Sequence, residues 1–197
     1  MKKRIIISSV AIILGILWFL RYNSLNSFYQ NNYGVVHETY QMGETVEFGQ
    51  DYIYGEQVEG YTITAEKAEL MTYSKFMSKY GINTSDVEKD DLIVCDITVK
   101  VSNLGSTAPG VYIPYLTLYG ADFQVGWSDE LLNIANPFLQ GNLGFSLYDG
   151  ETCTIQLAYG LSRNSFTDRT WRSLDQTQFW IRLTDYPTEK RIAIAFS

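Results

Sequence analysis

Few side chains in this sequence could do chemistry. The only histidine, His37, lies in a polar stretch without neighbouring ligands, which favours a solvated side chain over a metal ligand. Asp86, Glu88, Asp90 and Asp91 form an acidic run that lacks the glycine and the terminal glutamate of a calcium loop, so we expect a solvated loop. There is no nucleophile-elbow motif and no glycine-rich nucleotide motif. The sequence therefore predicts a protein that is not an enzyme and that has no cofactor and no metal site.

The two cysteines, Cys95 and Cys153, both occupy positions that are predicted to face inward on strands. Two interpretations stay open. A protein outside the cytoplasm with two cysteines can form a disulfide, which in a sandwich would join one sheet to the other. Alternatively, both are small buried side chains with free thiols. The second interpretation is slightly favoured, because the facing of a strand does not fix the Cα separation that a disulfide needs.

The tryptophans are candidates for stacking against a ligand. Trp127 and Trp171 lie in predicted loops, where an aromatic side chain can form a binding platform. Trp180 lies within a predicted strand, which indicates packing. Packing in the core or at an edge is also the commoner role for the two loop tryptophans.

An apolar segment near the N-terminus predicts membrane insertion. Residues 5–22 are expected to form a transmembrane signal anchor, although the uncharged run is shorter than the roughly 20 residues of a typical span. Trp18 and Tyr22 lie at its distal end, where interfacial aromatic residues are common. Basic residues precede the run, so residues 1–4 are expected to be a cytoplasmic tail and the remainder to lie outside. The alternative is a cleaved signal peptide and a secreted protein.

The rest of the chain divides into a tether and a domain. Residues 23–42 are polar and lack periodicity, which predicts an extracytoplasmic stalk, and residues 43–197 are expected to fold as one domain. The chain has 22 acidic and 15 basic residues, and four of the basic ones flank the apolar segment. An acidic domain repels phosphate backbones, so we expect no nucleic-acid binding. The expected partners are the membrane and an envelope or surface protein; the sequence does not specify the oligomeric state.

Alternation of apolar and polar residues predicts strands through most of the domain. The clearest alternation runs from Leu92 to Asn103 and puts one set of side chains on a core face and Asp96, Thr98 and Lys100 on a solvent face. Further strands are predicted at 45–48 (with 51–54 as its continuation), 61–71, 112–119, 143–147, 151–159, 179–183 and 191–196.

Two segments interrupt the strands. Residues 73–80 carry aromatic and apolar side chains at helical spacing, so we expect a short helix that begins after Thr72 and ends at Gly81. Residues 162–177 are expected to form a polar loop with Arg163, Arg169 and Arg172. About seven strands without a βαβ rhythm predict an all-β fold, an antiparallel immunoglobulin-like β-sandwich.

Two of these strands and one turn also carry a family resemblance. The runs Asp91–Asn103 and Leu147–Leu157, with Gly43–Val46 at the start, resemble uncharacterised immunoglobulin-like domains of Gram-positive bacteria. Those domains are secreted or membrane-anchored and are grouped with the telokin-like and immunoprotective-extracellular-protein sandwiches. The resemblance covers about residues 43–196 and implies an extracytoplasmic module without catalytic residues. The leading hypothesis is a protein-interaction or structural module of the cell envelope, and the alternative is a small-molecule or carbohydrate-binding domain.

Overall fold

The computed structural model describes residues 12–24, 35–82, 91–108, 110–121 and 123–196. The chain divides into two compact units, Met1–Val36 and His37–Ser197. In the first unit, the described part contains a helix over residues 12–24. No helix in the described ranges has both the length and the apolar character needed to cross a membrane. Residues 5–11 of the predicted anchor and the predicted tail at 1–4 lie outside the described residues.

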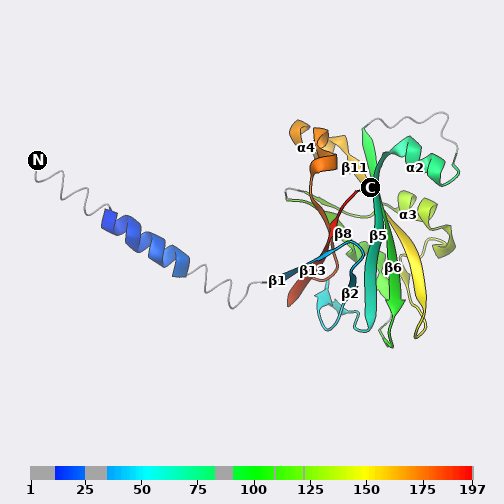
Figure 1. Cartoon of the computed structure of the whole chain (residues 1–197), viewed down its shortest axis with the longest axis horizontal. Helices are drawn as coiled ribbons and strands as arrows, with labels where there is room; N and C mark the ends of the chain where they lie inside the picture. Colours follow the sequence, from blue (N-terminus) through cyan, green and yellow to red (C-terminus); the bar gives the residue numbers. More distant parts are fainter. Residues whose placement is uncertain (1–11, 25–34, 83–90, 109, 122, 197) are drawn as a thin grey trace, which may run out of the picture. The chain divides into compact units, whose positions relative to one another are not determined.

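The second unit is built around two β-sheets (Figure 1). One sheet has five strands in the spatial order β1 (Val36–Gln41), β13 (Thr188–Ile194), β12 (Phe179–Arg182), β8 (Thr117–Tyr119) and β9 (Gln124–Val125). The other has four strands in the order β11 (Thr152–Ser162), β6 (Leu92–Asn103), β5 (Tyr61–Thr72) and β2 (Thr45–Glu47). Two short antiparallel ribbons accompany them, β3 (Tyr52–Ile53) with β4 (Glu56–Gln57), and β7 (Val111–Tyr112) with β10 (Gly144–Phe145).

The main hydrophobic core is formed by residues of both sheets. Its largest fully buried side chains are aromatic or branched, and they include Tyr61, Ile63, Ile97, Tyr159 and Phe179. These residues alternate with polar ones along their strands, which is the period that turns every second side chain toward one face. The predicted β-rich sandwich is therefore confirmed.

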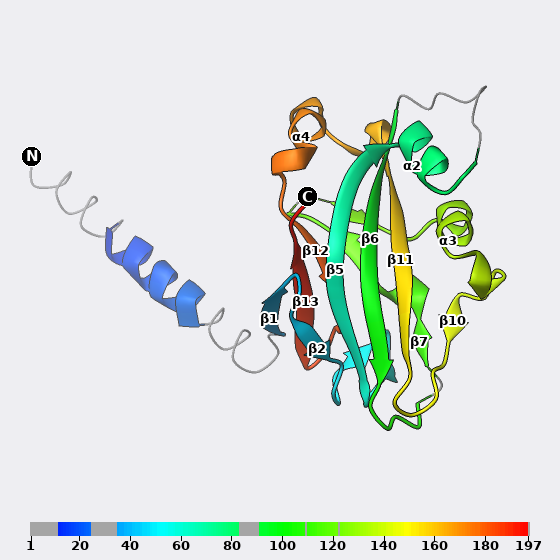
Figure 2. The same ribbon diagram turned by 45° about the vertical axis from the view of Figure 1, so that its right-hand side comes forward.

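A second, smaller apolar cluster covers the outer face of the four-stranded sheet. The helices α2 (Tyr73–Lys79) and α3 (Asp129–Ala135) contribute to it, and Val94 and Ala158 contribute from the sheet. Figure 2 shows the two helices beside β11 and β6. Their presence corrects one expectation. Asp96, predicted to face solvent, is 2% exposed, because α2 lies over that part of the strand.

Helix α2 begins and ends as the sequence predicts. Thr72 is its N-cap and accepts a hydrogen bond from the backbone N–H of Lys75 at 3.3 Å. Gly81 follows the helix with a φ of +75°, a left-handed conformation that glycine adopts without steric cost. The helix ties to the sheet through Lys79, whose Nζ lies 2.8 Å from Asp96 and 2.7 Å from Glu69.

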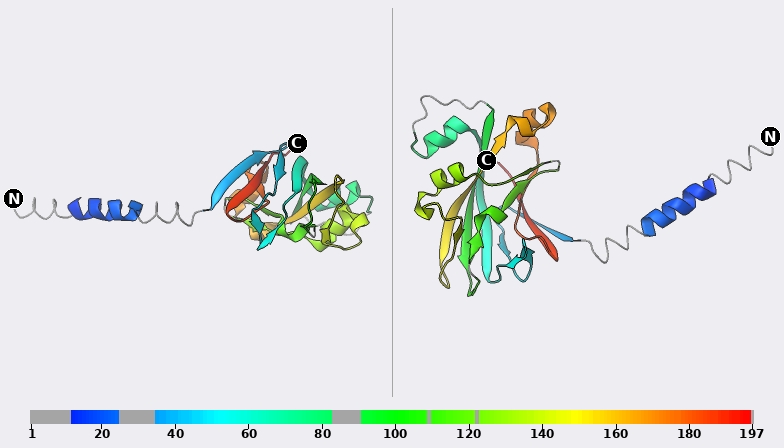
Figure 3. Two further views of the ribbon diagram at one scale, coloured as in Figure 1. Left: turned by 90° about the horizontal axis from the view of Figure 1, so that it is seen from below. Right: turned by 180° about the vertical axis from the view of Figure 1, so that it is seen from behind.

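Three expectations about element boundaries were wrong. The predicted stalk ended at residue 42, whereas Val36–Gln41 forms strand β1 at one edge of the five-stranded sheet. The predicted strand 112–119 is interrupted by a 3-10 turn at Ile113–Tyr115, where Pro114 cannot donate to a ladder. The predicted loop at 162–177 contains helix α4 (Asp168–Arg172) between two 3-10 turns. Figure 3 shows α4 at the same end of the domain as α2.

Candidate functional site

The two cysteines are free thiols in the structure. They lie on neighbouring strands of one sheet, where Cys95 pairs with Tyr159 and Cys153 pairs with Val101. A separation of six residues along a strand is about 20 Å at the usual rise per residue, far beyond the reach of a disulfide. The candidate disulfide between opposite sheets is therefore corrected to two unpaired thiols. Burial raises the pKa of both, and Cys95 is fully buried.

The two loop tryptophans do not come together. Trp127 is half-buried and packs against the main core. Trp171 in α4 lines a hollow of about 280 Å³ with Leu70, Ile93 and Leu174, and the guanidinium of Arg163 lies 5.8 Å from its ring. Trp171 also packs against the main core and contacts the ring of Phe166, so what distinguishes it from Trp127 is the hollow that it lines.

Of the histidine and the acidic run, the structure describes His37 and Asp91. The imidazole Nδ1 of His37 lies 3.2 Å from the carboxylate of Glu189, on the exposed surface of β1. The acidic residues Asp86, Glu88 and Asp90 lie outside the described residues. Within the described ranges, no group of three or more His, Cys, Asp or Glu side chains could hold a metal ion.

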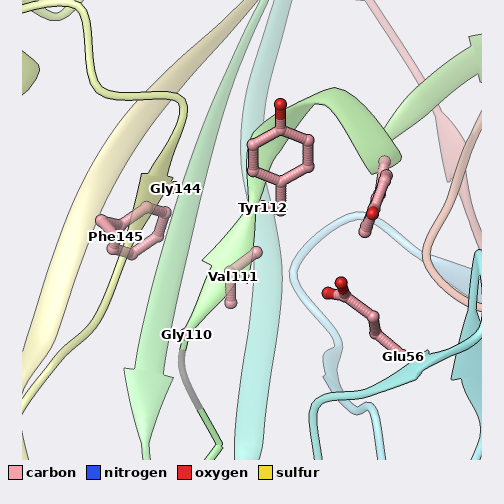
Figure 4. Close-up of a pocket in the computed structure, with 7 residues that line it drawn as sticks. Glu56, Gly110, Val111, Tyr112, Gly144 and Phe145 are labelled. Carbon is pink, nitrogen blue, oxygen red and sulfur yellow. The ribbon is translucent and has the colours of Figure 1, made fainter.

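One hollow on the domain is lined in part by aromatic side chains. It has a volume of about 410 Å³ and lies beside the ribbons β3–β4 and β7–β10. We call it the tyrosine hollow, and its lining residues are Glu56, Gly110, Val111, Tyr112, Tyr115, Gly144 and Phe145. Figure 4 shows the Glu56 side chain extending from β4 toward the strand that carries Val111 and Tyr112.

The break in the predicted strand at 112–119 brings two of these tyrosines together. The 3-10 turn at Ile113–Tyr115 places residues three apart on the same side, since such a helix has three residues per turn. The rings of Tyr112 and Tyr115 accordingly meet edge to face, with centroids 4.8 Å apart and planes at 71°. Ile113 between them is buried and fixes the turn against the core. Tyr112 itself remains 39% exposed, so its ring is available to a ligand.

Two glycines allow close packing of β7 and β10 at one side of the tyrosine hollow. A Cβ at Gly110 would lie 2.1 Å from the carbonyl oxygen of Phe145, far below any real contact distance. The φ of Gly110 is +121°, which also excludes other residues. Across the ribbon, Gly144 faces Tyr112, and a Cβ there would lie 3.3 Å from the Tyr112 ring. Gly110 therefore allows the close approach of the β7 and β10 backbones, and Gly144 leaves room for the ring of Tyr112.

A third tyrosine is clamped behind the tyrosine hollow. Tyr54 has a φ of +48°, a conformation that costs energy for a residue with a side chain. The Asp185 carboxylate accepts a hydrogen bond from its backbone N–H at 2.8 Å, and Arg182 donates one to its hydroxyl at 2.9 Å. Its ring stacks on that of Tyr115 at 5.0 Å. The surrounding contacts thus fix Tyr54 and, through it, one ring of the hollow.

Glu56 supplies the negative charge of the tyrosine hollow. Its side chain is exposed, and no cation of the described part of the chain forms an ion pair with it. Desolvation and the nearby Glu56 carboxylate raise the pKa of Tyr115 above its ordinary value. The hollow therefore combines ring faces, ring hydroxyls and one carboxylate, and these groups can bind a ligand but supply no base–nucleophile pair.

The comparison with protein families places the chain. Residues 37–190 match the family described as "Domain of unknown function (DUF5028)". The chain belongs to the DUF5028 family. The DUF5028 match begins at His37, within strand β1, and it includes every residue that lines the tyrosine hollow.

Solved structures resemble this DUF5028 protein only distantly. A functionally unknown protein from Listeria monocytogenes has 12% identity and a TM-score of 0.46, over 79% of this chain and 89% of that one. A conserved hypothetical protein from Bacillus anthracis has 8% identity and a TM-score of 0.42, over 75% and 95%. A "putative lipoprotein" from Bacillus subtilis has 15% identity and a TM-score of 0.42, over 76% of this chain but only 39% of that protein. A comparison with curated proteins gave no match.

The residues of the tyrosine hollow were missed by sequence reasoning. The chain has 15 tyrosines, and that abundance gave no reason to single out Tyr54, Tyr112 and Tyr115. One signal was present, because Pro114 interrupts the run that was interpreted as a strand from 112 to 119. A break at that proline would have predicted that Tyr112 and Tyr115 share a turn. Nothing in the sequence predicts that Glu56 lies beside them.

Proposed function

We propose that this DUF5028 protein is a non-enzymatic module of the cell envelope whose sandwich domain binds another envelope protein through the tyrosine hollow. The observation that carries the proposal is the edge-to-face pair of the exposed Tyr112 and the half-buried Tyr115, with ring centroids 4.8 Å apart, over a turn whose Ile113 is buried. Tyrosine is enriched at protein interfaces, because it gives a large contact area for the loss of few rotatable bonds.

The exposed aromatic surface extends beyond the hollow, which supports a protein partner. Tyr52 is 39% exposed, Tyr54 is 52% exposed and Tyr186 is 60% exposed. A backbone hydrogen bond from Tyr52 to Tyr186 at 2.6 Å places Tyr52 next to Tyr186, and Tyr54 stacks on Tyr115 of the hollow. Exposed aromatic residues that lie close together are typical of a surface that is covered by another molecule.

Anchoring to the membrane is part of the same proposal. The apolar run within residues 5–22, with basic residues before it, supports a single-pass anchor that leaves the immunoglobulin-like domain outside the cytoplasm. The check is fractionation of cells that make the full chain. A protein that stays with membranes after an alkaline carbonate wash supports the anchor. Release into the medium with a new N-terminus would instead support a secreted protein.

A carbohydrate or small-molecule ligand is the alternative function. The observation that favours it is the position of Trp171, which lines its own largely apolar hollow beside Leu70 and Ile93. An indole ring at the mouth of a hollow can stack on the apolar face of a sugar. That function predicts a saturable change in tryptophan fluorescence on titration with a glycan, and the change should be absent in Trp171→Leu.

Crosslinking in intact cells tests the protein partner. A photoreactive phenylalanine analogue replaces Tyr112 in the full chain, and in a matched control it replaces Tyr148, which is 83% exposed and does not line the tyrosine hollow. We expect one adduct of defined mass from position 112 and none from position 148. The adduct should weaken when Tyr115→Ala is added, because that change removes the second ring. Absence of any adduct at 112, or equal adducts at both positions, would contradict the proposal.

A further inference from the structure

We propose that the tyrosine hollow receives a single cationic side chain, a lysine or an arginine that the partner protein presents. This inference rests on the proposed function and specifies the chemistry of recognition. It follows from three features of the described residues, namely the angle between two rings, a carboxylate without a cation, and the fixed position of the rings.

The first feature is the geometry of the rings. Tyr112 and Tyr115 meet at 71°, so their two planes enclose an angle and do not form one flat platform. A cation is attracted to the negative face of an aromatic ring, and rings set at an angle can surround it. A sugar ring, in contrast, stacks best on a flat aromatic face. The volume of about 410 Å³ lies near the low end of the range of roughly 300–1,000 Å³ for small-molecule sites.

The second feature is the charge of Glu56. Three carboxylates that are at most 30% exposed have a cation close by: Asp51 has Lys190 at 2.8 Å, Asp185 has Arg182 at 3.1 Å and Asp96 has Lys79 at 2.8 Å. Glu56 belongs instead to the exposed carboxylates of the domain. Glu56 forms no such ion pair with any cation in the described ranges. A carboxylate next to ring faces favours a cation over a neutral or anionic ligand. The acidic excess of the whole chain, with a formal net charge of −7, attracts the same kind of ligand.

The chain already uses this interaction internally. The guanidinium of Arg182 lies 5.5 Å from the centre of the Tyr54 ring, and that of Arg191 lies 5.0 Å from the Trp180 ring. Each of these arginines also has a carboxylate within 4 Å, Asp185 for Arg182 and Glu189 for Arg191. Ring, cation and carboxylate thus occur together at both places. The tyrosine hollow presents the ring faces and the carboxylate, and the cation is what a partner would add.

The third feature is preorganisation. Tyr54 is held in its left-handed conformation by Asp185 and Arg182, and it stacks on Tyr115. Gly110 and Gly144 fix the opposite wall by allowing the close approach of β7 and β10. A ligand therefore does not have to order these rings, and the entropic cost of binding is lower. Backbone strain that the surroundings maintain in this way is common at functional sites.

Ligand-observed NMR on the full chain in detergent micelles tests the inference. The probes are Nα-acetyl-lysine methylamide, the same compound with an acetylated ε-amine, and a methyl glycoside. We expect saturation transfer to the charged lysine probe, and much weaker transfer to its neutral form and to the glycoside. Glu56→Gln should weaken binding of the charged probe by about fivefold or more, and Tyr112→Leu should do the same.

The matched control is Glu59→Gln, which removes the same charge from an exposed glutamate that does not line the tyrosine hollow. This variant should leave the transfer unchanged. The inference is overturned if the neutral lysine probe binds as well as the charged one, if Glu59→Gln weakens binding as much as Glu56→Gln, or if the glycoside is the probe that binds. Its failure is distinguishable from that of the proposed function. If the adduct from position 112 persists in the Glu56→Gln variant, the proposal of a protein partner stands and the inference of a cationic side chain is rejected.

Discussion

At the scale of single residues, burial decides which groups can react. Cys95 lies in the core with no exposed surface, and Cys153 lies near the start of β11 with part of its surface exposed. Burial raises the pKa of each thiol above its ordinary value, and the nearby charge of Asp96 or Glu151 raises it further. Because the thiolate is the reactive form, both thiols should be slow to react at neutral pH.

Alkylation followed by mass spectrometry checks this prediction. In the folded chain at pH 7.5 without reductant, we expect slow labelling of Cys153 and no labelling of Cys95. After denaturation both thiols should be labelled, whereas Cys153→Ser should accept one label only. A denatured chain that accepts no label without reductant would show that the two cysteines are bonded after all.

At the scale of elements, one side chain hydrogen-bonds to the backbone of the edge strand of the four-stranded sheet. Strand β11 is at that edge, and the buried Asn136 after α3 imitates a neighbouring strand. Its amide donates to the carbonyl of Gln156 at 2.8 Å and accepts from the backbone N–H of Gln156 at 2.8 Å. It also donates to the carbonyl of Leu132 at 2.9 Å. An exposed edge is a template for pairing with other chains, so this contact protects the sheet.

Replacement of Asn136 tests the protection of the edge. Asn136→Leu keeps the volume but leaves the N–H and C=O of Gln156 without their partner, so we expect a loss of about 2 kcal/mol in the free energy of unfolding. The measurement is urea denaturation of the full chain, together with light scattering for aggregation. Asn142→Leu, at an exposed position in the same region, should change stability by less than about 0.5 kcal/mol. Equal effects of the two substitutions would contradict the role assigned to Asn136.

Elements differ in how well the sequence predicts them. The strand from Leu92 to Asn103 and the helix after Thr72 were predicted closely. In each case the spacing of apolar residues indicates the type of element, and the flanking residues mark where it begins and ends. The burial of Asp96 was not predicted, since it depends on a helix that packs on the far side of the strand. The tyrosine hollow was not predicted either, because it also depends on contacts between segments that are not periodic in the sequence. Its tyrosines meet through a short turn, and Glu56 comes from a ribbon distant in sequence.

At the scale of the whole domain, one buried ion pair ties the two sheets together. Lys190 lies on β13 of the five-stranded sheet, and its Nζ is 2.8 Å from the carboxylate of Asp51. The same ammonium donates to the carbonyl oxygens of Glu47 and Phe48 at 2.9 and 3.1 Å, at the end of β2 in the other sheet. The side chains of both partners are less than 15% exposed. Loss of one partner would leave a largely buried charge without compensation.

We therefore expect Lys190→Met to lower the free energy of unfolding by about 3–5 kcal/mol. The control is Lys100→Met, at an exposed position on β6, which should change stability by less than about 0.5 kcal/mol. Chemical denaturation followed by tryptophan fluorescence gives both values. The double variant Asp51→Asn with Lys190→Met should recover part of the loss, because it removes the unpaired carboxylate. A loss below about 1 kcal/mol would reject Lys190 as a link between the sheets.

Gly110 has a consequence for how the DUF5028 family can be surveyed. Because any side chain at this position would collide with the backbone of Phe145, a homologue with a larger residue there must have separated the two strands of the ribbon. Glycine at this position, with aromatic residues at 112 and 115, is therefore a sequence signature that can sort relatives by whether they keep the tyrosine hollow. Lineages that keep the signature are the ones in which the same kind of partner should be sought.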